Sequence, residues 1–399
     1  MQHPVARIGQ IHYFFRYFET FLQHNNFTAR NVFFKDVVDL MKDQKLGSFL
    51  HDAVLSLGAM QAVKLGAPAG FDLSQSYNLA MCYYSKSVLG LRHALDRIDQ
   101  LPNARHGMLW TTHLLGLFEL MSDSTGQGWI QHLVHGTSKA LVAAGPSACE
   151  LGLGQRFFTE IRIFEVCRAI IFNQPTFLAD PEWRRLTEKM PLAKGTVEAP
   201  SLDELLDIIV LCSTLRVRAS SFVRSLVERE LASSDEYLDD AYSIVQEGFH
   251  LRQALVDWEA RESSYSSDSF SEGGSTVYDN FTSLAGAFFS ATSIYLSGVF
   301  DYETTHWQEM GIIVPNLGEE EIQVHVASIL AHTDTILNGS SISPLLVLFP
   351  LRVAGARSCE SWQQECITQH LAMVERTFPV ASDFRADLGK VWSRRSFGG

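Results

Sequence analysis

Apolar residues recur every three to four positions along nearly all of this chain, and this period restricts the fold more than any other feature. Ile11, Phe14 and Phe18 begin one such series, and a second runs through residues 49–65. This spacing places apolar side chains on one face of an α-helix. Strand-like runs are confined to short stretches such as residues 312–314. The sequence therefore predicts an all-α fold, an antiparallel helix stack with an internal pocket.

The expected helices cover most of the chain. They are expected at residues 11–22, 49–65, 74–98, 106–122, 129–144, 155–173, 202–230, 236–258, 278–298, 319–337 and 360–376. Segment 106–122 is apolar on nearly every side, which is typical of a helix at the centre of a core.

One segment is long enough to cross a bilayer. Residues 281–300 carry no charge over twenty positions, between Asp279 and Asp301. Six of the twenty are Ser or Thr, and no Lys or Arg lies near either end to set an orientation. We therefore expect a helix buried in the protein, and no membrane contact.

The charge balance argues against contact with nucleic acid. The chain has 32 basic and 45 acidic residues, a net charge of −13. An acidic surface repels phosphate backbones, so we expect no direct DNA binding by this chain. The six cysteines are scattered between Cys82 and Cys366 without a CxxC pair, which excludes a zinc ribbon.

A Ser-rich, acidic stretch interrupts the helical pattern. Residues 261–276 contain many serines, and the stretch 263–274 within them ends in two glycines, a composition typical of a flexible surface loop. Apart from this loop, residues 1–399 are expected to form a single helical domain.

The common catalytic signatures are absent from the sequence. It contains no GxSxG nucleophile elbow, Walker A loop or HExxH zinc motif. His132 and His135 lie one helical turn apart, but no third ligand follows at a suitable spacing. We expect neither a metal nor another cofactor.

A ligand site is predicted in an apolar cavity whose lining includes side chains that can form hydrogen bonds. The cavity is expected between segment 106–122, the helix from Trp129 and the C-terminal segment around Phe349. The candidate ligand-binding residues are Trp110, His113, Trp129, His132, His135 and Phe349. Trp110 and His113 share a helix face by their spacing, as do His132 and His135. The alternative, in which these side chains only pack in the core, stays open.

Several short motifs, taken in order, resemble a known family. They are FFRYFE at 14–19, FLHDAVLSLGA at 49–59, YYSKSVLGL at 83–91, WIQHLVHG at 129–136, LVAAGP at 141–146, LFPLRVAG at 348–355 and VW at 391–392. Their order and spacing resemble the fungal-specific transcription factor domain, the regulatory domain that follows a binuclear zinc-cluster DNA-binding module. The resemblance extends over about residues 10 to 395.

Two features depart from the family pattern. A zinc cluster needs six cysteines in a short basic stretch, and here they are spread widely. The chain is then either a part that starts downstream of such a module or a homologue that never binds DNA. The family also usually places a small residue where His135 stands.

The resemblance implies a regulatory protein of the nucleus, with the cytoplasm as the alternative. Such a domain senses a small hydrophobic effector, contacts coregulators, and forms a homodimer or a heterodimer with an intact transcription factor. The expected output is control of a metabolic or secondary-metabolite pathway. The competing hypothesis is a repurposed helical protein that binds a hydrophobic metabolite and acts as a biosynthetic enzyme, because steering a reaction by shape needs no sequence motif.

Overall fold

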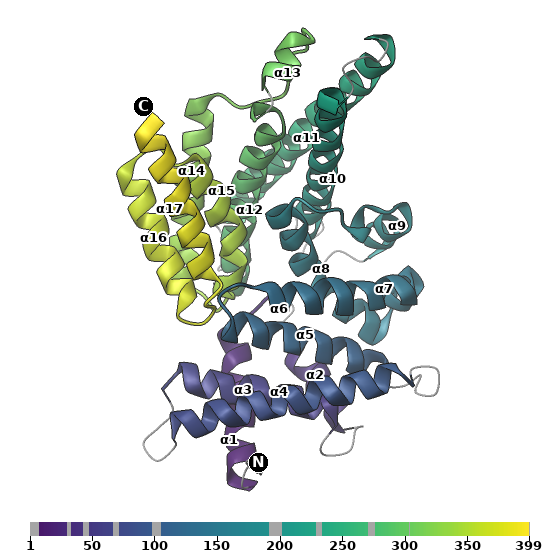
Figure 1. The fold of residues 1–399 in the computed structure, drawn as a ribbon, viewed down its shortest axis with the longest axis vertical. Coiled ribbons are helices and arrows are strands. Elements are labelled where there is room, and N and C mark those ends of the chain that lie inside the picture. Colours follow the sequence, from purple (N-terminus) through teal and green to yellow (C-terminus); the bar gives the residue numbers. More distant parts are fainter. Residues whose placement is uncertain are drawn as a thin grey trace. The chain divides into compact units, whose positions relative to one another are not determined.

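The computed structural model describes residues 8–29, 33–42, 48–66, 72–97, 105–190, 202–228, 234–269, 276–302 and 304–398. Within these ranges the chain forms seventeen α-helices and no strand, which confirms the all-α prediction (Figure 1). The helices are α1 (Ile8–Gln23), α2 (Phe33–Lys42), α3 (Phe49–Lys64), α4 (Leu73–Leu95), α5 (Arg105–Ser122), α6 (Gln127–Ile130), α7 (Lys139–Ala144), α8 (Gly152–Phe172), α9 (Pro181–Lys189), α10 (Leu202–Glu228), α11 (Ser234–Ser269), α12 (Thr276–Asp301), α13 (Thr304–Glu309), α14 (Glu319–Gly339), α15 (Leu348–Arg357), α16 (Ser361–Glu375) and α17 (Ala381–Gly398).

The expected helix at residues 129–144 is present but is not uniform. The chain is α-helical in α6, continues as a π-helix, η3 (Gln131–Ser138), and returns to α-helix in α7. A π-helix holds more residues per turn than an α-helix and occurs frequently at functional sites. The apolar period could not show this change, since it reports which face is apolar and not how tightly the helix is wound.

The expected loop at residues 261–276 is wrong over its first part. Residues 261–269 are the last turns of α11, while residues 270–275 lie outside the described residues. Serine is only mildly unfavourable in a helix, and Ser264 donates its hydroxyl hydrogen bond to the carbonyl oxygen of Ala260. Arg261 also pairs with Glu204 of α10, which holds this part of α11 against its neighbour. Flexibility of the remaining stretch stays a prediction.

The sequence indicates one domain, whereas the packing divides the chain into two compact units, each built from separated segments. Unit 1 comprises residues 1–162, 341–345 and 371–389, and unit 2 comprises residues 163–340, 346–370 and 390–399. In unit 1, α3 contacts α1, α4 and α5. In unit 2, α12 contacts α10, α11, α14 and α15.

The two expected core helices are buried. In α5, the buried residues include almost every position from Gly107 to Met121. Segment Phe281–Asp301 of α12 has the length and composition of a membrane span, but 89 % of its apolar stretch is buried inside the protein. It is therefore a core helix, as the Ser and Thr content predicted.

A glycine brings α1 and α3 into contact in unit 1. A β-carbon on Gly58 would lie 2.0 Å from the carbonyl oxygen of Phe14 and 3.2 Å from the backbone nitrogen of Phe18. Because these are backbone atoms, no side-chain rotation can relieve the clash. Only glycine allows the two helices to approach this closely.

Replacing Gly58 by alanine is expected to lower the free energy of unfolding by about 2 kcal/mol, since α1 must shift away from α3. Gly389→Ala in α17 is the matched control, because its β-carbon would meet no atom within 4 Å. That change should raise stability by up to about 1 kcal/mol through helix propensity. Urea denaturation measures both, and equal effects at the two positions would refute the close approach at Gly58.

In unit 2, side chains satisfy the carbonyl groups at the C-terminal end of α15. These groups lack partners within the helix itself. Trp392 Nε1 donates to the carbonyl oxygen of Gly355 at 2.8 Å, and Arg395 Nη2 donates to that of Ala356 at 2.6 Å. Gln323 Nε2 donates to the carbonyl oxygen of Arg357 at 3.0 Å. Helices α14 and α17 thus cap α15 in place of a terminal glycine.

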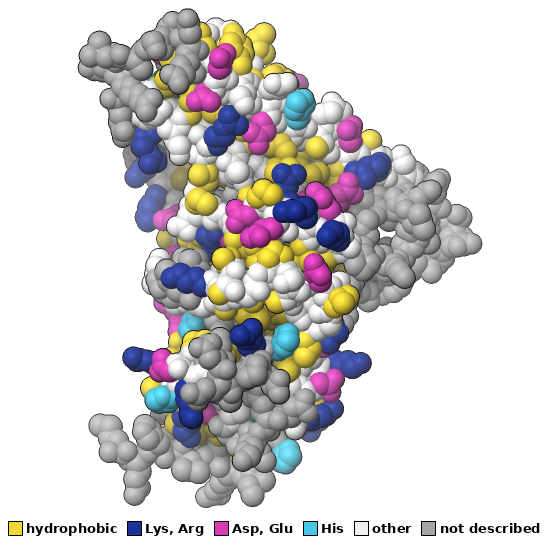
Figure 2. All heavy atoms as spheres, turned by 90° about the vertical axis from the view of Figure 1, so that its right-hand side faces the viewer, with side chains coloured by type: hydrophobic (Ala, Val, Ile, Leu, Met, Phe, Trp, Pro, Cys, Tyr) yellow, Lys and Arg dark blue, Asp and Glu magenta, His cyan; other side chains and the backbone are white. Residues whose placement is uncertain are grey.

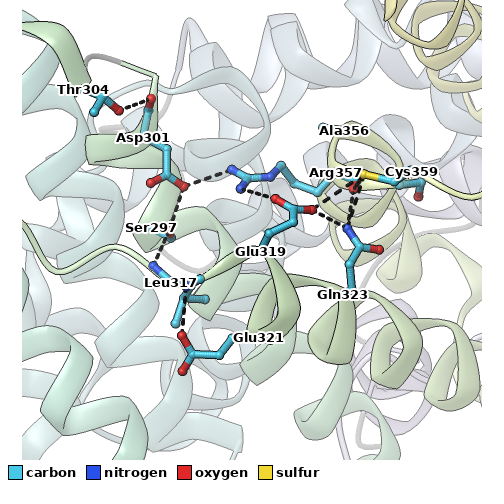
Figure 3. A network of polar contacts seen from close by, with 12 residues as sticks. Ser297, Asp301, Thr304, Leu317, Glu319, Glu321, Gln323, Ala356, Arg357 and Cys359 are labelled. Atoms are coloured by element: carbon cyan, nitrogen blue, oxygen red, sulfur yellow. Dashed lines mark hydrogen bonds and ion pairs between the residues drawn. The ribbon is translucent and has the colours of Figure 1, made fainter. Parts of the chain in front are cut away.

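An ion-pair network surrounds the same helix end (Figure 3). Arg357 Nη1 lies 3.0 Å from Asp301 Oδ2, and Arg357 Nη2 lies 3.7 Å from Glu319 Oε2. Ser297 donates to Asp301 at 2.7 Å, and the backbone N–H of Leu317 donates to Ser297 at 2.9 Å. The network links the end of α12, the start of α14 and the end of α15.

Candidate functional site

A half-buried polar cluster in unit 1 joins three separate helices. Glu119 is the only acidic residue of α5. The Tyr84 hydroxyl of α4 donates to Glu119 Oε1, and the same hydroxyl oxygen lies 3.1 Å from His132 Nε2 of η3. His132 Nε2 lies 3.9 Å from Glu119 Oε1. We call Tyr84, Glu119 and His132 the polar cluster.

Aromatic packing fixes the Tyr84 ring. It stacks on Phe118 of α5 with ring centroids 4.7 Å apart and planes at 19°. The His132 ring meets it edge-on, at 6.2 Å and 88°. The ring positions hold the hydroxyl between carboxylate and imidazole.

Burial sets the protonation states of the polar cluster. Desolvation, reinforced by the hydrogen bond to Glu119, raises the pKa of Tyr84 well above its ordinary value. Desolvation lowers the pKa of His132, although Glu119 opposes this shift. At neutral pH the phenol of Tyr84 and the imidazole of His132 are therefore both neutral.

Two glycines allow the helices to close around the polar cluster. A β-carbon on Gly116 of α5 would lie 3.3 Å from Trp129 Cδ1 and 3.6 Å from His132 Cβ. A β-carbon on Gly128 of α6 would lie 2.4 Å from Glu119 Oε2. Trp129 and His132 therefore both flank Gly116, and the Glu119 carboxylate lies directly against the backbone of α6.

Trp110 and His113 share a helix face, as their spacing predicts, but they pack in an aromatic group of their own. Trp110 is fully buried and stacks on Phe33 of α2, with centroids 4.6 Å apart at 16°. His113 lies 6.2 Å from Trp110 and 5.5 Å from Phe33. Burial lowers the pKa of His113 to about 3, so its imidazole is neutral. These ring contacts favour the packing interpretation for both residues.

The remaining predicted ligand-binding residues do not all lie at one site. Trp129 and His132 come together beside Gly116. The backbone of His135 belongs to η3, but its side chain lies outside the described residues. Phe349 belongs to α15 of unit 2, where its ring meets Phe288 edge-on at 5.4 Å and 85°. The cavity expected among all these residues stays a prediction.

Sequence reasoning missed two members of the polar cluster, Tyr84 and Glu119. The available signal was Glu119 itself, because a lone carboxylate in an otherwise apolar helix needs a partner when buried. The partner could not be found from the sequence, since Tyr84 is 35 positions away on another helix.

Helix α8 carries further ionisable side chains with internal partners. In unit 1, Glu160 accepts a hydrogen bond from Thr28 at 2.8 Å, and Arg156 Nε contacts both carboxylate oxygens of Asp36 at 2.9 and 2.8 Å. In unit 2, Arg168 pairs with Glu165 at 2.7 Å. These contacts are internal and lie away from the polar cluster in the sequence.

The described side chains include no group of three or more His, Cys, Asp or Glu residues arranged to hold a metal ion. The polar cluster has the composition of a hydrogen-bonding site for an organic molecule. Its carboxylate, imidazole and phenol can accept or donate hydrogen bonds and relay a proton.

Comparison with known protein families gives a match that covers nearly the whole chain. A family model described as the fungal specific transcription factor domain matches residues 10–399. An uncharacterized protein of Emericella nidulans is 24 % identical over 119 residues, which is 30 % of this chain and 25 % of that protein. The chain thus matches only a quarter of that relative's length. No solved structure matches the chain.

Proposed function

Because the chain belongs to the fungal-specific transcription factor domain family, we propose that it is a regulatory module that changes transcription when a small effector binds to its helical domain. The proposed target is a metabolic or secondary-metabolite pathway, and the proposed compartment is the nucleus. The observation that carries the effector part is the polar cluster. A carboxylate and an imidazole, each about 20 % exposed, stand beside Trp129 at a π-helix.

Partial burial suits a regulatory ligand. A fully buried cluster could not be reached, and a fully exposed one would gain little from a hydrogen bond in competition with water. The π-helix also offers a local element whose geometry a ligand could bias, because i→i+5 winding is less favourable than α-helical winding.

We propose that DNA contact comes from another polypeptide segment or a partner chain, such as an intact transcription factor. The net charge of −13 supports this. On the face drawn in Figure 2, basic and acidic side chains are interspersed without a continuous basic patch. A homodimer, a heterodimer or a coregulator complex would each allow the domain to act at a promoter.

The test is a reporter assay in a fungal host. The chain is fused to a heterologous DNA-binding module, and reporter transcription is compared with that of the module alone. We expect at least a fivefold change in transcription. A fusion that never alters the reporter over a range of growth conditions would count against regulation by this domain.

Replacing Tyr84 by phenylalanine is expected to remove most of that transcriptional response. The change deletes the hydroxyl that links Glu119 to His132 and keeps the ring that stacks on Phe118. The stability loss should be about 1 kcal/mol, one part-buried hydrogen bond. Tyr77→Phe on the exposed face of α4 is the matched control and should respond like the natural chain. If the two variants gave equal transcriptional responses, the polar cluster would not be needed for regulation.

A second candidate function rests on the chemistry of the same groups. A phenol held between a carboxylate and an imidazole is a composition used in general acid–base catalysis. In that case the domain would convert a hydrophobic metabolite. Mass spectrometry of metabolite extracts incubated with the natural protein and with Tyr84→Phe distinguishes the two, because only an enzyme consumes a compound in a Tyr84-dependent way.

A further inference from the structure

The hydrogen bonds of the polar cluster have a fixed direction. Tyr84 has one hydroxyl proton, and it is donated to Glu119 Oε1. The contact of 3.1 Å between Tyr84 and His132 Nε2 is then a hydrogen bond only if Nε2 carries a proton and donates it to the phenol oxygen. The neutral imidazole therefore has its proton on Nε2 and a free electron pair on Nδ1.

The direction of these hydrogen bonds determines which polar atoms remain available to a ligand. Glu119 Oε2 and His132 Nδ1 have no hydrogen-bond partner among the described residues. Both atoms are acceptors, and one belongs to a carboxylate. The site thus offers two hydrogen-bond acceptors and a negative charge, while its donors are already used within the cluster.

One aromatic side chain lies next to the polar cluster. Trp129 lies one helical turn before His132 and, like it, borders Gly116. The indole is only partly buried. An aromatic ring beside two acceptors is the arrangement that recognises an amphipathic molecule, with a flat apolar body and a polar donor head.

From these contacts we propose that the polar cluster binds an apolar, ring-containing ligand through a donor group, a protonated amine or a hydroxyl, and excludes ligands whose head is a carboxylate. This rests on the proposed function of the cluster as the effector site and specifies its ligand class. A carboxylate head would face Glu119 with like charge and would leave Oε2 and Nδ1 without a proton to accept.

Three probes with the same phenyl body test the inference: 2-phenylethylamine, 2-phenylethanol and phenylacetate. Their dissociation constants are measured by titration NMR on the full chain. We expect the amine to bind most tightly, the alcohol next, and phenylacetate at least tenfold more weakly than the amine. Phenylacetate binding as tightly as the amine, or no binding of amine and alcohol, would overturn the inference.

Two variants test whether Glu119 is the source of the selectivity among the probes. Glu119→Gln keeps an acceptor for the Tyr84 hydroxyl and removes the charge, so the amine should lose at least tenfold in affinity relative to phenylacetate. Glu320→Gln on the exposed start of α14 removes the same charge elsewhere and should keep the natural order of probes. If both variants behave alike, the selectivity is a property of the net charge and the proposed site is wrong.

The result is separable from the proposed function. Donor selectivity that depends on Glu119, together with a reporter that ignores Tyr84→Phe, would support the ligand class and refute the regulatory role. A reporter that depends on Tyr84, together with tightest binding of phenylacetate, would do the reverse.

Discussion

Replacing Arg357 by methionine is expected to lower the free energy of unfolding by about 3 kcal/mol. The guanidinium is 13 % exposed and pairs with Asp301, which is 17 % exposed, at 3.0 Å. Methionine keeps most of the apolar stem of the side chain but leaves the carboxylate without its cation. Removal of one partner from a buried ion pair costs about 3–5 kcal/mol. The hydrogen bond from Ser297 to Asp301 remains, which places the expected value at the lower end.

Arg218→Met is the matched control, since Arg218 also pairs with a carboxylate at 3.0 Å, that of Glu247, but the two side chains are 42 % and 36 % exposed. That change should cost less than about 0.5 kcal/mol. The double variant Arg357→Met with Asp301→Asn removes both charges and should recover part of the loss. Urea unfolding measures all three, and a single Arg357 variant as stable as the control would contradict the network in Figure 3.

The stability of the protein is expected to depend on pH through Glu160. Desolvation is the main cause that raises the pKa of this carboxyl to about 7. The hydrogen bond from Thr28 opposes the shift, and the nearby Asp36 carboxylate adds to it. Arg156 faces the same group of carboxylates, but its guanidinium is bound to Asp36. His106 lies near Asp36 and Arg156 as well, and desolvation lowers its pKa.

The direction of the pH dependence follows from the pH at which the unfolded and the folded protein each lose the Glu160 proton. In the unfolded chain Glu160 ionises near its ordinary pKa of about 4.5, whereas the folded protein keeps the proton up to about pH 7. Stability from this group is therefore full at low pH and is lost as the pH rises from 4.5 to 7, by about 3 kcal/mol in total.

Glu160→Gln has no proton to lose. The stability of this variant relative to the natural protein should rise by about 2.5 kcal/mol between pH 5 and pH 8. Glu320→Gln, which removes an exposed carboxylate, corrects for the change in net charge. Urea denaturation at both pH values gives the difference directly, and a difference that does not vary with pH would show that Glu160 is not buried as described.

Most of the fold could be predicted from the sequence because helical periodicity is a local property. The segment expected at 106–122 is α5 within one residue at its start, and Trp110 and His113 share a face as their spacing requires. Helix α15 was missed because Pro350 follows two residues after its start, and proline is tolerated only in the first turn. The family was also predicted from the order of the packing motifs, and the family match over residues 10–399 confirms it.

The polar cluster could be predicted only in part, because it depends on contacts between distant segments. His132 was found as a polar residue on a helix, but its contact with Tyr84 joins residues 48 positions apart. Phe33, which stacks on Trp110, comes from α2, a ten-residue helix that no expected segment included. Neither the π-helix nor the glycine contacts have a sequence signature of their own.

The discontinuity of the two units has a consequence for synthesis on the ribosome. Phe21 of unit 1 packs edge-on against Phe378 at 6.4 Å, so its partner is translated only after all of residues 163–370. At elongation rates of about 5–20 residues per second, that interval lasts roughly 10–40 s. During this time the nascent unit 1 presents apolar surface that residues 371–389 will later cover. We therefore expect the nascent chain to bind chaperones that recognise exposed apolar segments.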